Sequence, residues 1–121
     1  MKYMVVVKAS ENQGMPPQEL FAAIDQLGVD ATKAGVQVDT GGLLPSAMGA
    51  RVRIADRKLI ITDGPFTETK ELIGGFAIYN VASKQEALEW TKRFMDLHLK
   101  HWPEWEGEAE IRQMYEAAGT S

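Results

Sequence analysis

The order of apolar segments along the chain constrains its fold more than any other feature of the sequence. Two strand–helix–strand segments of similar length stand on either side of a short hairpin. The predicted elements are a strand at 3–7, a helix at 16–34, a strand at 36–44, a hairpin at 51–62, a strand at 76–81, a helix at 83–101 and a strand at 109–115. This order predicts an α+β, ferredoxin-like split βαβ fold with an added hairpin, in which an antiparallel sheet has helices on one face.

Both helices are predicted from apolar periodicity and from residues that favour helix ends. Pro16 and Pro17 open the first helix, and Gly35 stands where a left-handed C-cap is favoured. Ser83 and Glu86 form a capping box at the start of the second helix. The apolar faces predicted to be buried are Leu20, Ile24, Leu27, Ala31 and Ala34 in the first helix, and Ala87, Trp90, Phe94 and Leu97 in the second.

The second face of the predicted sheet needs a cover. Two helices cover one face only, yet the strand segments 4–7 and 76–79 carry apolar residues at consecutive positions. Both faces of the sheet therefore favour burial. A second copy of the chain is the simplest cover, because twofold pairing is the commonest oligomeric arrangement. We expect a homodimer.

Composition narrows the classes of partner and cofactor. The chain has 121 residues and a net charge of −4, which fits one domain over residues 1–121. Because no basic cluster is present, we expect no direct nucleic acid binding and no membrane surface binding. The first apolar run is too short for a signal peptide, so we expect a cytoplasmic protein. Without a dinucleotide fingerprint, no cofactor is predicted. No metal site is predicted either, and because the chain has no cysteine, any metal would have to bind through histidines and carboxylates.

A dense polar motif lies between the hairpin and the following strand. Residues 62–76 read Thr-Asp-Gly-Pro-Phe-Thr-Glu-Thr-Lys-Glu-Leu-Ile-Gly-Gly-Phe. This segment resembles the signature of the DGPF-motif branch of the YCII-related family, and the other segments follow in a similar order over essentially the whole chain. The resemblance implies a ferredoxin-like α+β fold in a dimeric α+β barrel. It implies little about chemistry, since most members have no assigned reaction, and some are encoded beside extracytoplasmic-function sigma factors.

The motif has a structural and a functional interpretation. Asp63, Gly64 and Pro65 make a turn from residues that favour one. The number of ionisable side chains around them exceeds what a turn needs, and Asp63 at a strand end, with Lys70 nearby, is a workable general base or ligand anchor. The candidate catalytic residue of the motif is Asp63, and its candidate ligand-binding residues are Gly64, Pro65, Phe66, Glu68 and Lys70.

Two histidines complete the candidate site. His98 and His101 lie one helical turn apart on the core side of the second helix and are the only histidines of the chain. Distant relatives resemble lyases and isomerases with a His–Asp pair, but their pair cannot be transferred, because no histidine precedes His98. Hydrogen-bonded structural histidines, a metal pair completed by a carboxylate, and acid–base residues all stay open. We predict His98 and His101 as catalytic candidates.

Three functions stay open at this level. The first is a small-molecule enzyme of the lyase or isomerase type, with Asp63 as the base and His98 or His101 as the acid. The second is a non-enzymatic ligand-binding or regulatory dimer, which could be linked to sigma-factor-dependent transcription. The third is a structural dimer whose motif only shapes a turn.

Aromatic residues at the C-terminal end could pack against a second subunit or line a ligand pocket; they are Trp102, Trp105 and Tyr115.

Overall fold

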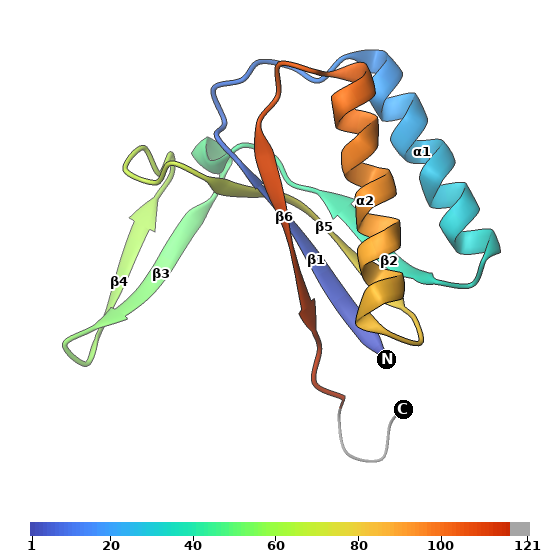
Figure 1. Ribbon diagram of the computed structural model, residues 1–121. Coiled ribbons are helices and arrows are strands. Elements are labelled where there is room, and N and C mark those ends of the chain that lie inside the picture. The colour runs from blue at the N-terminus through green and yellow to red at the C-terminus, as the bar shows by residue number, and fades with distance from the viewer. Residues whose placement is uncertain (117–121) are drawn as a thin grey trace.

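The protein is described from a computed structural model, which covers residues 1–116. Its elements are β1 (Lys2–Ala9), α1 (Gln18–Lys33), β2 (Gln37–Gly42), the 3-10 helix η1 (Ser46–Met48), β3 (Ala50–Ala55), β4 (Lys58–Asp63), β5 (Leu72–Asn80), α2 (Lys84–His101) and β6 (Gly107–Gln113). Each helix and strand expected from the sequence is found, with boundaries that shift by a few residues. The chain path is shown in Figure 1.

The sheet confirms the predicted α+β fold. Four strands pair antiparallel in the order β2-β5-β1-β6, and β3 and β4 form a separate antiparallel pair. With that pair set aside, the strand order is the ferredoxin-like one. The core lies between the sheet and the two helices, where Tyr3 and Val5 of β1 pack with Tyr79 of β5, Ala31 of α1 and Ala87 of α2.

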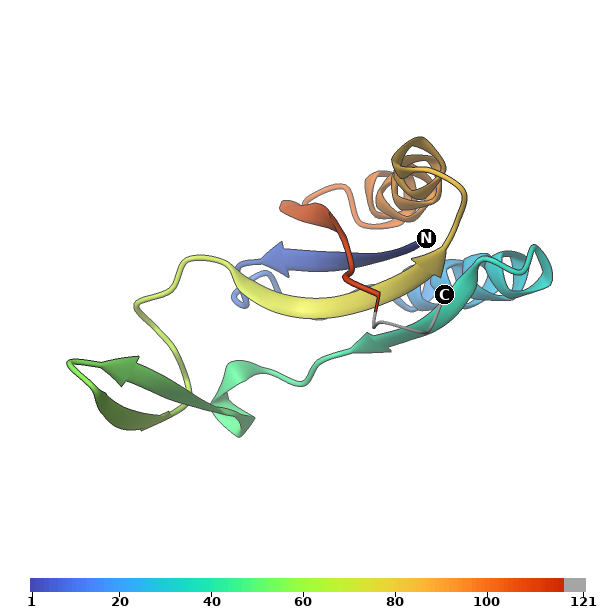
Figure 2. The same cartoon turned by 90° about the horizontal axis from the view of Figure 1, so that it is seen from below.

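The sheet face turned away from the helices is called here the outer face. Side chains alternate along a strand, so Met4 and Val6 point there while Tyr3 and Val5 point to the core. Met4 lies opposite Ile78 and Val6 lies opposite Phe76, and all four side chains are half-buried. Within residues 1–116 no helix covers this apolar centre (Figures 1 and 2).

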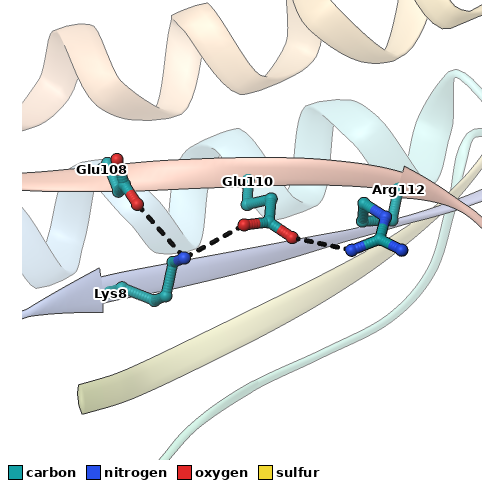
Figure 3. Close-up of polar contacts among 4 residues, drawn as sticks. All are labelled: Lys8, Glu108, Glu110 and Arg112. Carbon is teal, nitrogen blue, oxygen red and sulfur yellow. Dashed lines mark hydrogen bonds and ion pairs between the residues drawn. The ribbon is translucent and has the colours of Figure 1, made fainter. Parts of the chain in front are cut away.

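A row of charges with alternating sign flanks the apolar centre of the outer face. The Lys8 ammonium lies 3.1 Å from Glu108 and 3.0 Å from Glu110, and Arg112 lies 3.1 Å from the other oxygen of Glu110 (Figure 3). Hydrogen bonds to Glu110 and Glu108 raise the pKa of Lys8. Hydrogen bonds from Lys8 and Arg112 lower the pKa of Glu110. Both shifts favour the charged forms of Lys8 and Glu110.

The first helix differs from its prediction at two positions. Leu20, Leu27 and Ala31 are buried as expected. Ile24 is only half-buried and, like Leu20 and Leu27, borders a cavity. Ala34 is exposed, because it follows the last helical turn as the C-cap. The predicted C-cap glycine is confirmed, since Gly35 has a φ of 74°.

The capping box at the second helix is confirmed in its hydrogen bonds. The Glu86 N–H donates to the Ser83 hydroxyl at 3.1 Å, and the Glu86 carboxylate accepts from the Ala82 N–H at 3.0 Å. The buried stripe of α2 consists of Ala87, Thr91 and His98. Of the predicted face, Ala87 is buried as expected, Trp90 is half-buried against the core, and Phe94 and Leu97 are half-buried.

The predicted hairpin is present and projects from the body of the protein. It is called here the arm and comprises residues 50–63, with Ala50 opposite Asp63 and Ala55 opposite Lys58. Asp56 and Arg57 at its tip have φ angles of 50° and 63°. Figures 1 and 2 both place the arm beyond the end of the sheet and away from α1 and α2. No helix within residues 1–116 is long and apolar enough to cross a membrane.

Candidate ligand-binding site

The structure separates the predicted site residues into two groups. The residues of the motif lie at the base of the arm, where β4 ends and the chain returns toward β5. His98 lies in the last two turns of α2 and faces the sheet, while His101 ends the helix and is half-buried.

Backbone contacts hold the motif against η1. The Gly64 N–H donates to the Gly49 carbonyl at 2.9 Å, and the Phe66 N–H donates to the Ser46 hydroxyl at 3.3 Å. Gly64 approaches η1 so closely that a Cβ atom there would lie 1.7 Å from the Ser46 carbonyl oxygen. The Gly64–Pro65 peptide bond is cis. Glycine is therefore required at this position by packing between two backbone segments.

Glu11 fixes η1 from the other side. Its carboxylate accepts from the Ser46 N–H at 2.7 Å and from the Ser46 hydroxyl at 2.9 Å. The Ser46 hydroxyl donates its proton to Glu11 and accepts from Phe66, so this hydroxyl links the β1–α1 loop to the motif. Sequence reasoning missed Glu11 and Ser46, since neither belongs to a recognisable local pattern.

Arg51 of β3 holds the segment that follows the motif. Its guanidinium lies 3.9 Å from the centroid of the Phe66 ring, forms an ion pair with Glu68 and donates to the Thr69 hydroxyl at 2.7 Å. A hydrogen bond from the backbone of Glu68 itself, together with Arg51, lowers the pKa of the Glu68 carboxyl. Two of the predicted ligand-binding residues, Phe66 and Glu68, thus contact Arg51 of the same chain.

The other predicted residues of the motif face solvent. Asp63, Pro65 and Lys70 are exposed. The contacts described for residues 1–116 include no side-chain hydrogen bond or ion pair to Asp63 or Lys70. Their predicted roles therefore stay predictions.

His98 is the most enclosed ionisable side chain of the candidate site. It is 8% exposed, and its ring packs on Trp105 and Phe94 with centroid distances of 4.5 Å and 4.8 Å. Its Nδ1 lies 3.1 Å from the Phe94 carbonyl oxygen, so the neutral ring carries its proton on Nδ1. Burial lowers the pKa of His98, and the hydrogen bond to Phe94 opposes that shift. His98 is therefore neutral at physiological pH.

The second ring nitrogen of His98 is available to a ligand. Nε2 has no hydrogen-bond partner among the contacts described for residues 1–116. In that range no buried side-chain nitrogen or oxygen lacks a partner, which means that Nε2 is not sealed from solvent. A neutral imidazole with its proton on Nδ1 presents a lone pair at Nε2. This atom can accept a hydrogen bond or a proton.

His98 lines a cavity of about 990 Å³ between the helices and the sheet, called here the helix–sheet cavity. Most of its wall is apolar, including Val5 and Val7 of β1 and Ile24 of α1. Trp102 and Trp105 also line it, whereas Tyr115 is fully exposed. The polar side chains of the wall that lie on the sheet and α2 are Gln37, Thr40, Tyr79, Thr91 and His98.

A smaller cleft of about 550 Å³ lies at the base of the arm and is called here the base cleft. Leu44, Met48 and Phe66 line it. The two hollows adjoin, since both are bordered by Glu11, Leu43, Leu44, Pro45, Leu72 and Ile73. Asp63 and His101 border neither hollow. Among residues 1–116, no group of three or more histidine, cysteine, aspartate or glutamate side chains could hold a metal ion.

Comparison with known proteins assigns the family. The sequence model of the YCII-related domain matches residues 1–95. The chain belongs to the YCII-related family. It is also 35% identical over 72 residues to an uncharacterized protein of Rhizobium meliloti (strain 1021), and this alignment covers 60% of the chain and 56% of the relative. The match thus spans about half the length of that relative.

The family match confirms the predicted YCII-related family; the DGPF-motif branch stays a prediction. The match also bears on the site. It ends at residue 95, before His98, Trp102 and Trp105. These three cavity-lining residues therefore lie outside the part of the YCII-related protein that the family model matches.

The buried histidine should make the stability of this YCII-related protein depend on pH. The folded-state pKa of His98 is lowered below 6.5, so the unfolded chain takes up this proton first as the pH falls. The contribution of neutral His98 to the free energy of unfolding is fully present above about pH 6.5. It declines as the pH falls from there toward the lowered folded-state pKa of His98. Urea melts of the wild type and His98→Phe at pH 7.5 and 5.5 should show a smaller decline in the variant. His101→Gln, which leaves His98 in place, should keep the wild-type decline; equal declines in all three proteins would contradict the assignment.

Proposed function

We propose that this YCII-related protein binds a small, largely apolar molecule in the helix–sheet cavity and holds it by a hydrogen bond to Nε2 of His98. The observation that carries the proposal is a buried, neutral histidine that lines a mostly apolar cavity and has one ring nitrogen without a partner among residues 1–116. Its volume of about 990 Å³ falls in the range of ligand pockets. Such pockets combine apolar walls with a few polar groups that orient the ligand.

The hydrogen bonds already formed within the cavity wall indicate one kind of polar group that the ligand should carry. The Thr40 hydroxyl already donates to the Phe76 carbonyl at 3.0 Å, and the Thr91 hydroxyl donates to the Ala87 carbonyl at 2.8 Å. Both hydroxyls, like Nε2 of His98, can therefore only accept from a ligand. These acceptors favour a ligand with a hydroxyl or amine donor on an apolar skeleton, and the Gln37 amide and the Tyr79 hydroxyl of the same wall can donate to other ligand atoms.

A cavity-filling substitution tests the proposal. Ile24→Trp adds a large side chain to the wall, so we expect loss of the small molecules that native mass spectrometry detects on the wild type. Ile24 is half-buried, which lets the protein fold with a larger side chain there. Leu99→Trp is the matched control, because Leu99 is 71% exposed on α2 and does not border the cavity. Retention of the same ligands by Ile24→Trp would contradict binding in this cavity.

An acid–base enzyme is the second candidate, and the same nitrogen favours it. A neutral imidazole near physiological pH is a suitable general base. Asp63, the base expected from the sequence, borders neither hollow, so this candidate rests on His98. Incubation of an identified ligand with the protein in D₂O tests it. Exchange of a ligand C–H that depends on His98, absent with His98→Gln, supports proton abstraction, and no exchange favours binding alone.

We further propose that the protein is a twofold dimer whose copies cover each other's outer face. The apolar centre of that face supports this pairing, and so does the charge row. Its signs alternate along Glu108, Lys8, Glu110 and Arg112. A twofold axis reverses the row, so that each negative side chain meets a positive one of the other copy. A mass of one chain by light scattering at micromolar concentration would contradict the dimer.

A further inference from the structure

The arm presents an apolar face that nothing covers within residues 1–116. Val52 lies opposite Ile61, and Ile54 lies opposite Leu59, so the four side chains share one face of the hairpin. They are 65%, 72%, 77% and 69% exposed, in that order. A two-stranded ribbon is marginally stable alone, and a continuous exposed apolar face marks an interaction surface. The arm therefore needs a partner.

The charge of the arm is opposite to that of the rest of the chain. Its basic side chains outnumber its acidic ones four to two: Arg51, Arg53, Arg57 and Lys58 against Asp56 and Asp63. The arm thus carries +2, and since the whole chain carries −4, the remainder carries −6. Arg53, Arg57 and Lys58 form no ion pair among the contacts described for residues 1–116. The body of a second copy is electrostatically suited to receive the arm.

The base cleft is the apolar surface of the body that matches the arm. Leu44 and Met48 at this cleft are 72% and 71% exposed. Its charged lining residues are Glu11, Glu71 and Arg51, and Arg51, which belongs to the arm of the same chain, is already paired with Glu68. Because the arm and the cleft both stay exposed in one chain, the arm does not cover the cleft of its own chain. Each chain thus offers one apolar arm and one apolar cleft, the two halves of a reciprocal contact.

We propose that the arm of each copy docks its apolar face in the base cleft of the other copy, in a reciprocal twofold exchange. This inference rests on the dimer proposed above and adds a defined contact to it. The base cleft adjoins the helix–sheet cavity along Glu11, Leu44 and Ile73. The docked arm therefore closes that end of the cavity, and the ligand site is complete only in the dimer.

Cysteine cross-linking tests the contact directly, because the chain has no native cysteine. Leu59→Cys in the arm and Leu44→Cys in the base cleft are co-expressed on chains with different affinity tags and then oxidised. We expect a disulfide between the two different chains. Leu99→Cys replaces Leu59→Cys in the control, since Leu99 is similarly exposed but lies on α2. A mixed disulfide no more abundant than in this control overturns the arm exchange.

A charge substitution separates failure of the arm exchange from failure of the dimer. Ile54→Lys places a charge in the docked face, so the dissociation constant of the dimer should rise about tenfold or more, whereas Leu99→Lys should leave it unchanged. Both residues are highly exposed, so the fold should persist, which circular dichroism checks. A wild-type dimer that Ile54→Lys leaves unweakened overturns the arm exchange and leaves the dimer intact. A monomeric wild type overturns both.

Discussion

Replacing Gly64 by alanine is expected to destabilise the protein by about 3 kcal/mol, near the upper end of the usual range for overpacking. The new Cβ atom would lie 1.7 Å from the carbonyl oxygen and 2.6 Å from the carbonyl carbon of Ser46. Both neighbours are backbone atoms, so no side-chain rotation relieves the clash. The chain must move η1, and the hydrogen bonds from Gly64 to Gly49 and from Ser46 to Glu11 are strained with it.

Two variants serve as controls in the same urea melts. Gly28→Ala makes the same substitution within α1, where the new Cβ meets only the Gln37 side chain at 3.5 Å, and it should stabilise by about 0.5–1 kcal/mol through helix propensity. Asp63→Asn removes the charge of the neighbouring residue and should cost about 1 kcal/mol or less. A loss below about 1 kcal/mol for Gly64→Ala would contradict the close approach.

The contacts of the motif explain why its glycine and its aromatic residue stand where they do. Gly64 lets two backbone segments meet, Phe66 supports Arg51, and the Ser46 hydroxyl joins both sides through Glu11. Together they fix the base of the arm and form part of the base cleft. If the arm exchange holds, the motif acts on the ligand site by positioning the arm that closes the partner's cavity. Asp63, which is exposed at the end of β4, stays a prediction as a functional carboxylate.

Local patterns explain how much of the fold could be predicted from the sequence. The capping box of α2, the C-cap at Gly35 and the arm each depend on residues close together in the chain. Their geometry follows from hydrogen bonds and steric limits that short segments already contain. The apolar runs of β1 and β5 agree with the central places of these strands in the sheet, because such strands favour burial on both faces.

The site could be predicted only in part, because it depends on contacts between distant segments. The sequence predicts that His98 faces the core. Its distance from Asp63 could not be predicted, because Asp63 lies at the end of the arm strand β4, and the arm projects away from the cavity that His98 lines. Thr91 was missed, although the spacing Ala87, Thr91, Phe94, His98 fits a helical face. Gln37 and Thr40 border the cavity from a strand whose apolar pattern is weak, so no local signal marked them.

The second large effect is expected at Leu20, which is 1% exposed and is the largest fully buried side chain described. Leu20→Ala should lower the free energy of unfolding by about 2–5 kcal/mol, because it removes packed methyl groups and leaves a void that neighbouring side chains fill only in part. Sequence periodicity alone predicts a similar loss for Ile24→Ala, since both residues belong to the same predicted apolar face.

The half-buried position of Ile24 at the cavity wall gives a smaller expected loss. Truncation there removes apolar surface that is already partly open, so Ile24→Ala should cost about 1 kcal/mol. The two variants form a matched pair on one helix, and their urea melts at pH 7.5 measure the difference. Equal losses would mean that Ile24 is as enclosed as Leu20 and that α1 packs directly on the sheet. Leu20 borders the same cavity, so a clear excess for Leu20→Ala supports the half-buried position of Ile24 in the cavity wall.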